Sequence, residues 1–372
     1  MGSQGQTCLL FVLITVVAMH GMLEFYLRGP YSLLKNRDPA GTDLQSSVLA
    51  DSVGPGATSI GKDGHPQSSI VIDDADAAVA GGGHGEKATE TKKEKLRPLI
   101  LYAYSETENA RENLRYFVAN GLHGAADFIF VLNGPTDAAS TLIPGGRSNV
   151  RVVSRPNTCY DLGSHGEVLR KDGLWKGYDR FILLNASVRG PFVPYWSGAC
   201  WSDVYLDRVT EKVKLVGMTV NCRPQMHVQS MIWATDSTGM ELLLYPRQDK
   251  SEGDGGRLVA LQGCYDEKDV AIGAEVGATA AIRGAGYEVD AMMTAFHGGP
   301  SGWDYCESEV GIGAGAGDVL FDRAYFGTNV HPYETVFFKA NRGIDPRTLD
   351  LLSAWHQSGH MGNGSWETCG SS

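Results

Sequence analysis

From residue 98 onward, the chain alternates short apolar runs with amphipathic stretches. Apolar runs of strand length lie at 98–104, 127–132, 150–154, 178–184, 213–220 and 228–234. Between and after them, apolar residues recur at helical spacing over 110–118, 166–174, 238–245 and 268–284. Strands that alternate with helices indicate βαβ units and a mostly parallel sheet. We therefore predict one α/β domain over residues 98–372.

Polar clusters directly follow two of these predicted strands. Asn157 and Asp161 come after the third strand, and Asn185, Ser187 and Arg189 come after the fourth. Parallel sheets bind ligands at the carboxyl ends of their strands. At that edge the amide and carboxylate groups would bind sugar or ribose hydroxyls, and Ser187 and Arg189 would approach a diphosphate. The same residue types are common in turns, so the pattern alone leaves a purely structural role open.

The amino-terminal part of the chain has a different pattern. No charged residue occurs in 8–23, and the apolar character continues to residue 27 with Glu24 as the one interruption. A segment of about 20 apolar residues is long enough to span a bilayer. We interpret 8–27 as a transmembrane signal anchor that follows a short cytosolic tail, 1–7. A cleaved signal peptide is the alternative, although residues 18–21 fit a cleavage site poorly.

Residues 28–97 are rich in Gly, Ser, Asp, Ala and Thr, and no aromatic residue follows Tyr31 in this stretch. Such a segment cannot bury enough apolar surface to offset the entropy lost on ordering. We therefore predict a disordered stem. The composition changes sharply at Arg97, which places the start of the folded domain at residue 98.

Charge and cysteine content limit the environment of the domain. A net charge of -11 argues against nucleic acid as a partner, because nucleic-acid binders carry basic surfaces. Arg28, Lys35 and Arg37 would place the carboxy-terminal side in the cytosol by the positive-inside rule. The six cysteines beyond Cys8 instead suit an oxidising compartment, with 15 ways to pair, and six free thiols in a cytosolic protein are the alternative. We expect a single-pass type II protein of the Golgi or endoplasmic reticulum membrane, with its domain in the lumen.

Several segments in order over residues 98–345 resemble GT-A-type glycosyltransferases, most closely the rhamnan synthesis protein F family and its eukaryotic relatives. The segments are RPNTCYDLG (155–163), YDRFILLNASVRGPF (178–192), HVQSMI (227–232), EVG (275–277) with Gly286-Tyr287, HPYE (331–334) and KANR (339–342). Each element alone is only moderately specific, and the resemblance rests on their order.

The resemblance implies an α/β, GT-A-like (Rossmann-like) domain with a mostly parallel sheet and flanking helices. It also implies a nucleotide-sugar donor, linked to UDP, GDP or dTDP, and an acceptor hydroxyl on a glycan or glycoprotein. It leaves the donor sugar, the acceptor and the stereochemistry open. The substrate-binding residues expected on this basis are Asn157, Asp161, Asn185, Ser187, Arg189, His227, Gln229, Lys339 and Arg342.

One departure from the family pattern concerns a metal ion. The Asp-x-Asp position of this fold reads Asn-Ala-Ser at 185–187, so no carboxylate remains there to hold Mg²⁺ or Mn²⁺ beside the diphosphate. A divalent metal stays open, without a predicted ligand. Cationic side chains also neutralise a leaving diphosphate, and Arg189, Lys339 and Arg342 are the candidates. Of the two N-glycosylation motifs, the one at Asn363 is the better acceptor, because Asn185 would face the site.

An inverting sugar transfer needs a base that removes the proton of the acceptor hydroxyl. Glu275, in a largely apolar helical stretch, is the first candidate and Asp304 the second. The alternative for Glu275 is a charge on the solvated face of its helix. His227, beside Gln229, would contact the acceptor or a phosphate, although a histidine near a strand start is often structural.

The sequence therefore predicts a glycosyltransferase that moves a sugar from a nucleotide-sugar donor to a glycan or glycoprotein hydroxyl. The alternative is a catalytically inactive binding or scaffold protein of the secretory pathway on the same fold. The missing acidic pair at 185–187 keeps this alternative open.

Overall fold

The computed structural model describes residues 96–246, 258–299, 302, 304–307, 317–358 and 364–370. The chain divides into two units, Met1–Lys87 and Ala88–Ser372, and every described residue belongs to the second. The predicted tail, anchor and glycosylation motif at Asn363 lie outside the described residues, as does the predicted stem up to residue 95. Within the described ranges, no helix has the length and apolar character needed to cross a membrane.

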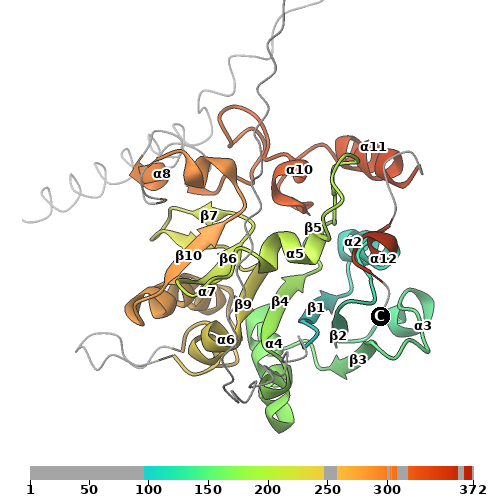
Figure 1. The fold of residues 1–372 in the computed structure, drawn as a ribbon, viewed down its shortest axis with the longest axis horizontal. Coiled ribbons are helices and arrows are strands. Elements are labelled where there is room, and N and C mark those ends of the chain that lie inside the picture. Colours follow the sequence, from blue (N-terminus) through green and yellow to red (C-terminus); the bar gives the residue numbers. More distant parts are fainter. Residues whose placement is uncertain are drawn as a thin grey trace, which may run out of the picture. The chain divides into compact units, whose positions relative to one another are not determined.

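The fold is built on a seven-stranded sheet with the strand order β10-β6-β9-β4-β1-β2-β3 (Figure 1). Its strands are β1 (Leu99–Ser105), β2 (Asp127–Asn133), β3 (Val150–Arg155), β4 (Arg180–Asn185), β6 (Val213–Gly217), β9 (Ile232–Asp236) and β10 (Glu288–Ala291). Strand β1 is parallel to β2 and β4, β2 to β3, and β6 to β10. Only β9 is antiparallel to its neighbours, β4 and β6. The predicted mostly parallel sheet is confirmed.

The four predicted helices are all present. The helices are α2 (Glu108–Asn120), α3 (Ala138–Thr141), α4 (Tyr160–Arg170), α5 (Trp201–Leu206), α6 (Ser237–Leu244), α7 (Lys268–Gly284), α8 (Asp304–Glu307), α10 (Pro332–Thr335), α11 (Pro346–Gln357) and α12 (Ser365–Thr368), with 3₁₀ turns η2 (Lys171–Gly177) and η3 (Thr294–His297). Two small antiparallel pairs complete the fold: β5 (Val188–Arg189) with β11 (Phe338–Lys339), and β7 (Val220–Asn221) with β8 (His227–Val228).

Three sequence predictions of element bounds were wrong, two for strands and one for a helix. The runs 213–220 and 228–234 are not single strands, because the chain leaves the main sheet after Gly217 and forms the β7–β8 pair before it returns as β9. A Cβ at Gly217 would lie 2.2 Å from a methyl group of Val228, so the crossing requires glycine. Helix α4 begins at Tyr160 rather than at residue 166.

The core consists of the sheet and the helices that cover it. Residues 99–104 of β1 are all at most 4 % exposed, as expected for a strand covered on both faces. Phe117 of α2, Trp201 of α5 and Phe337 form one aromatic cluster, with ring centroids 5.3–6.4 Å apart. Helix α4 packs against α7. These contacts fix the helices whose first turns border the carboxyl edge of the sheet.

Glycines in α4 permit a close approach of the chain ahead of α7. A Cβ at Gly166 would lie 2.1 Å from the carbonyl oxygen of Leu261, and one at Gly163 would lie 2.8 Å from that of Gly263. The approach places Cys264 against Cys159, and these two residues form a disulfide.

The six cysteines predicted to pair do so in three disulfides. The pairs are Cys159–Cys264, Cys200–Cys369 and Cys222–Cys306. Sequence alone left 15 connectivities open. The first bridge ties the loop after β3 to the loop before α7, so it joins two segments that border the site described next.

Candidate active site

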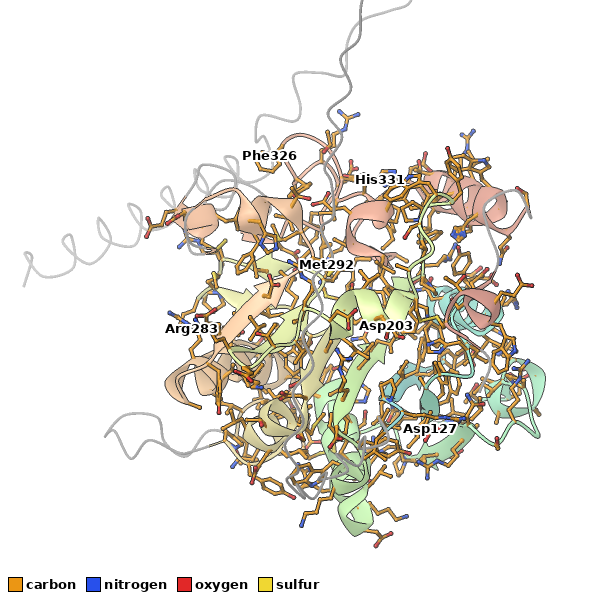
Figure 2. All side chains as sticks on the ribbon, in the orientation of Figure 1. Asp127, Asp203, Arg283, Met292, Phe326 and His331 are labelled. Carbon is orange, nitrogen blue, oxygen red and sulfur yellow. A yellow bond between two sulfur atoms is a disulfide. The ribbon has the colours of Figure 1, made fainter. Side chains whose placement is uncertain are left out.

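A cleft of about 670 Å³ lies at the carboxyl ends of β1, β2 and β4. Strand order reverses here, because the chain proceeds from β1 to β2 and β3 on one side and resumes with β4 on the other. Open α/β sheets bind ligands at such a switch point. The polar lining residues include Ser105, Thr107, Asn109, Asn133, Asn157, Tyr160, Asp161, Asn185, Ser187, Lys268, Lys339 and Asn341. Figure 2 labels Asp127, the first residue of β2, and Arg283, in the last turn of α7, which are at the ends of these elements opposite to the cleft.

A chain of hydrogen bonds crosses the floor of the cleft. Lys339 Nζ donates to Ser187 Oγ at 2.6 Å, and this hydroxyl donates to Asn185 Oδ1. Asn185 Nδ2 donates in turn to Asp161 Oδ2. All three bonds run in one direction, from the cation to the carboxylate, and hydrogen bonds aligned in this way polarise one another. The chain therefore holds Asn185 and Ser187 in a single orientation.

The small β5–β11 pair brings Lys339 to this position. Lys339 is opposite Val188 in the antiparallel register, and the backbone N–H of Ala340 donates to the carbonyl of Ser187 at 3.0 Å. The side chain of Lys339 is consequently buried beside the loop that follows β4. Strand β11 has only two residues and no recognisable apolar pattern, so this contact could not be predicted from the sequence.

The electrostatic surroundings of Lys339 are mixed. Burial and the neighbouring charge of Arg342 lower the pKa of Lys339 to about 8, while Glu275, Asp161 and Asp318 oppose this shift. Burial raises the pKa of Asp161, and the hydrogen bond from Asn185 opposes that change. The cleft thus places a cation near three carboxylates, none of which forms a salt bridge with it among the described residues.

A second polar group lies behind the cleft on α7. Glu275 Oε2 accepts a hydrogen bond from Ser230 Oγ at 2.6 Å, and Oε1 is 3.3 Å from His227 Nε2. Burial disfavours both charges, but the hydrogen bond and charge of each partner outweigh it, so the pKa of Glu275 falls and that of His227 rises. His227 Nδ1 lies 2.7 Å from the carbonyl oxygen of Gln225. Glu275 is therefore not a charge on the solvated face of α7.

Arg342 is held apart from Lys339 by its own partners. Its Nε lies 3.2 Å from Asp318 Oδ2, and its guanidinium lies 5.3 Å from the ring centroid of Phe321. Asn157, by contrast, is placed at the cleft, where its amide donates to Ser105 Oγ at 3.1 Å.

Six predicted site residues do not line the cleft: Glu275, His227 and Arg342, described above, and three others. Arg189 is buried, and its guanidinium binds Asn113, Asp350 and Ser353 of α2 and α11. Figure 1 shows α11 beside β5, where these contacts occur. The geometry offers no support for the predicted contact of Arg189 with a diphosphate.

The other two are Gln229 and Asp304. Gln229 is buried, and its Oε1 accepts from Thr219 Oγ1 at 2.7 Å. Asp304 begins α8, where its carboxylate packs against the backbone at Gly299. Neither side chain is positioned to contact a ligand in the cleft.

Sequence reasoning missed Tyr160, which borders the cleft with 46 % of its surface exposed. Both Cys159 and Tyr160 adopt left-handed backbone conformations, with φ of 70° and 50°. Such conformations are rare for residues other than glycine and are concentrated at functional sites. Tyr160 lies in the RPNTCYDLG segment, but the sequence does not reveal that its ring is exposed at the cleft.

The donor atoms in the cleft do not suit Mg²⁺ or Mn²⁺. The Oδ2 atom of Asp161 accepts a hydrogen bond from Asn185, and its Oδ1 atom accepts one from the backbone N–H of Leu162. The ammonium of Lys339 occupies the remaining side of Ser187. A hard divalent cation needs several free oxygen ligands. Two clusters of metal-ligating residue types occur elsewhere in the described ranges, but the cysteines in each are joined in a disulfide.

Comparison with known proteins leaves the family open. No family model and no curated protein matches the chain. Solved structures that align with it include a cytidylyltransferase from Leptospira borgpetersenii (TM-score 0.24, 10 % identity, 40 % of this chain) and an active-site mutant of LgtC (0.25, 11 %, 38 %). A third is the apo form of the glycosyltransferase GlyE from Streptococcus pneumoniae (0.26, 4 %, 40 %). The alignments span 64 %, 57 % and 35 % of those chains, and similarity this low does not identify an activity.

Proposed function

We propose that the protein is a glycosyltransferase that takes a sugar from a nucleotide-sugar donor bound in the cleft between β1 and β4. The observation that carries this proposal is the hydrogen-bond chain from Lys339 through Ser187 and Asn185 to Asp161. It joins a cation suited to phosphate with amide and carboxylate groups suited to sugar hydroxyls, in one polar cleft at the switch point of the sheet.

The positions of the motif segments support the same proposal. The segments around Asn157 and Asn185 were linked by their positions after predicted strands, and the segment around Lys339 by family resemblance alone, yet all three reach one cleft. Glu275 of the EVG segment and His227 of the HVQSMI segment form a pair behind it. A loop role for each segment separately would not require this convergence.

The proposed roles follow from chemistry and position. Asn157 and Asp161 bind hydroxyls of the ribose or the transferred sugar, and Lys339 contacts the diphosphate. Tyr160 provides an exposed ring on which the nucleobase stacks, since such rings accept any base face. UDP, GDP and dTDP donors all remain open.

The reaction is a displacement at the anomeric carbon of the donor. The acceptor oxygen forms the new glycosidic bond, and the bond between that carbon and the diphosphate oxygen breaks, with its electron pair leaving on the nucleoside diphosphate. We assign the acceptor proton to Glu275, whose charged state is stabilised by His227. The acceptor is a hydroxyl of a glycan or glycoprotein.

We propose the Golgi or endoplasmic reticulum lumen as the site of action, with residues 8–27 as the membrane anchor. The three disulfides support an oxidising compartment. In intact microsomes the domain should resist added protease until detergent is present. Digestion without detergent would contradict this assignment.

The test of function is a donor panel with the full-length chain. UDP-, GDP- and dTDP-sugars are incubated with it, with and without Mn²⁺, and release of the nucleoside diphosphate is measured. We expect turnover of one donor class, abolished in Asp161→Ala and retained in the control Asp207→Ala on the exposed end of α5. Nucleotide binding without turnover for any donor would favour the inactive binding protein.

A further inference from the structure

We infer that Lys339 takes the place of a divalent metal in this cleft, binding the diphosphate of the donor directly, so that donor binding and transfer need no metal ion. The inference rests on the proposed function and specifies how its donor is held.

The hydrogen-bond capacity of Lys339 leaves it able to bind an anionic ligand. Its side chain is 7 % exposed and borders the cleft. An ammonium group has three N–H donors, and among the described residues Ser187 Oγ is its one hydrogen-bond partner. Buried polar groups are nearly always satisfied, so the remaining donors are available to an acceptor on the cleft side. A diphosphate offers several acceptor oxygens.

The other buried or partly buried cations nearby are already paired. Arg189 binds Asp350, and Arg342 binds Asp318. Lys339 has no carboxylate within salt-bridge distance among the described residues, although Asp161, Glu275 and Asp318 are close enough to favour its charge. These carboxylates stabilise the ammonium without neutralising it by contact. Among the described residues that line the cleft, Lys339 is thus the buried cation available for a ligand, whereas Lys268 is exposed.

The arrangement also excludes a metal at the same position. Nζ of Lys339 lies 2.6 Å from Ser187 Oγ, which is an oxygen of the Asn-Ala-Ser segment that a metal ion would have to bind. A divalent ion there would meet the positive charge of Lys339 at short range and would find Asn185 and Asp161 engaged with each other. Lys339, which β11 holds in place, offsets charge on the leaving diphosphate as a divalent metal ion would.

The experiment measures nucleotide affinity of the full-length chain by calorimetry. UDP, GDP and dTDP are compared with the corresponding monophosphates, each in EDTA and in Mn²⁺. We expect one diphosphate to bind at least tenfold more tightly than its monophosphate, with less than twofold change between EDTA and Mn²⁺. In Lys339→Met the preference for diphosphate over monophosphate should disappear while monophosphate affinity is kept, and Lys339→Arg should recover part of it.

Lys212→Met is the matched control, because Lys212 is an exposed lysine that does not line the cleft. It should change the preference by less than threefold. Diphosphate binding that requires Mn²⁺, or a preference that survives in Lys339→Met, overturns the inference while leaving the proposed function intact. No binding of any nucleotide under either condition overturns the proposed function and this inference together. The EDTA comparison uses the unmodified chain, so it stands even if Lys339→Met fails to fold.

Discussion

The carboxylate of Glu275 lies 3.3 Å from Nε2 of His227, and both side chains are largely enclosed behind the cleft. The two residues come from different elements, α7 and β8. Helix α7 carries the small buried residues Ala274 and Ala278, which let it pack close to β8. The pairing of Glu275 with His227 therefore depends on the close packing of α7 against β8.

Replacement of Glu275 tests its role as the base. In Glu275→Gln we expect kcat to fall by about 10²- to 10⁴-fold with little change in donor KM, since general-base catalysis contributes about that much. The measurement is steady-state kinetics on the donor identified by the panel. Glu241→Gln on the exposed face of α6 is the control and should keep kcat within twofold. A Glu275→Gln protein that is folded and fully active would remove Glu275 from the mechanism.

The same pair predicts a pH dependence of stability. The lowered pKa of Glu275 contributes stability above the ordinary value of 4.5, and this is lost as the pH falls through the lowered pKa. The raised pKa of His227 contributes stability below 6.5, and this is lost as the pH rises through the raised pKa. The pair should therefore stabilise the fold most between these two pH values.

Urea unfolding of the wild type and of Glu275→Gln across pH 4 to 9 measures this dependence. The difference in unfolding free energy should be largest between pH 4.5 and 6.5 and decrease on both sides. A constant difference over the whole range would mean that the two side chains do not form an ion pair in solution.

Lys339 predicts a pH dependence of ligand affinity. Burial lowers its pKa to about 8, so the ammonium loses its charge as the pH rises through that value. Affinity for the nucleoside diphosphate should fall progressively from pH 7 to 9, and the fall should be absent in Lys339→Arg, because arginine stays charged. Calorimetry at several pH values checks this. An identical decline in both proteins would assign the titration to another group.

Tyr160 predicts a contribution of base stacking. Tyr160→Ala should weaken nucleotide affinity about tenfold, since stacking of one base on an aromatic ring contributes about 1–3 kcal/mol, and Tyr160→Phe should retain the affinity. Tyr195→Ala, at an exposed tyrosine outside the cleft, is the control. Equal losses in Tyr160→Phe and Tyr160→Ala would indicate that the hydroxyl, and not the ring face, makes the contact.

The sequence predicted the sheet because its central strands are uninterrupted apolar runs and its helices have regular spacing. It also located Asn157, Asp161 and Asn185, because polar residues directly after parallel strands must meet at one edge. The contact of Lys339 with Ser187 was beyond its reach, since it depends on a two-residue strand and a separation of 152 residues.

Arg189 shows the opposite limit of sequence reasoning. It lies in β5, two residues beyond Ser187, and its guanidinium is bound by Asn113 of α2 and Asp350 of α11 instead of facing the cleft. Proximity along the chain therefore identified the segment correctly without deciding which side chains of the segment face a ligand.

The most direct measurement is a structure of the full-length chain with the nucleoside diphosphate selected by the binding panel, obtained in EDTA. We predict that the diphosphate lies within hydrogen-bond distance of Lys339 Nζ, with the sugar end toward Asp161 and the base on the ring of Tyr160. A nucleotide bound elsewhere on the domain, or a diphosphate that lies in the cleft without contact to Lys339, would contradict the account.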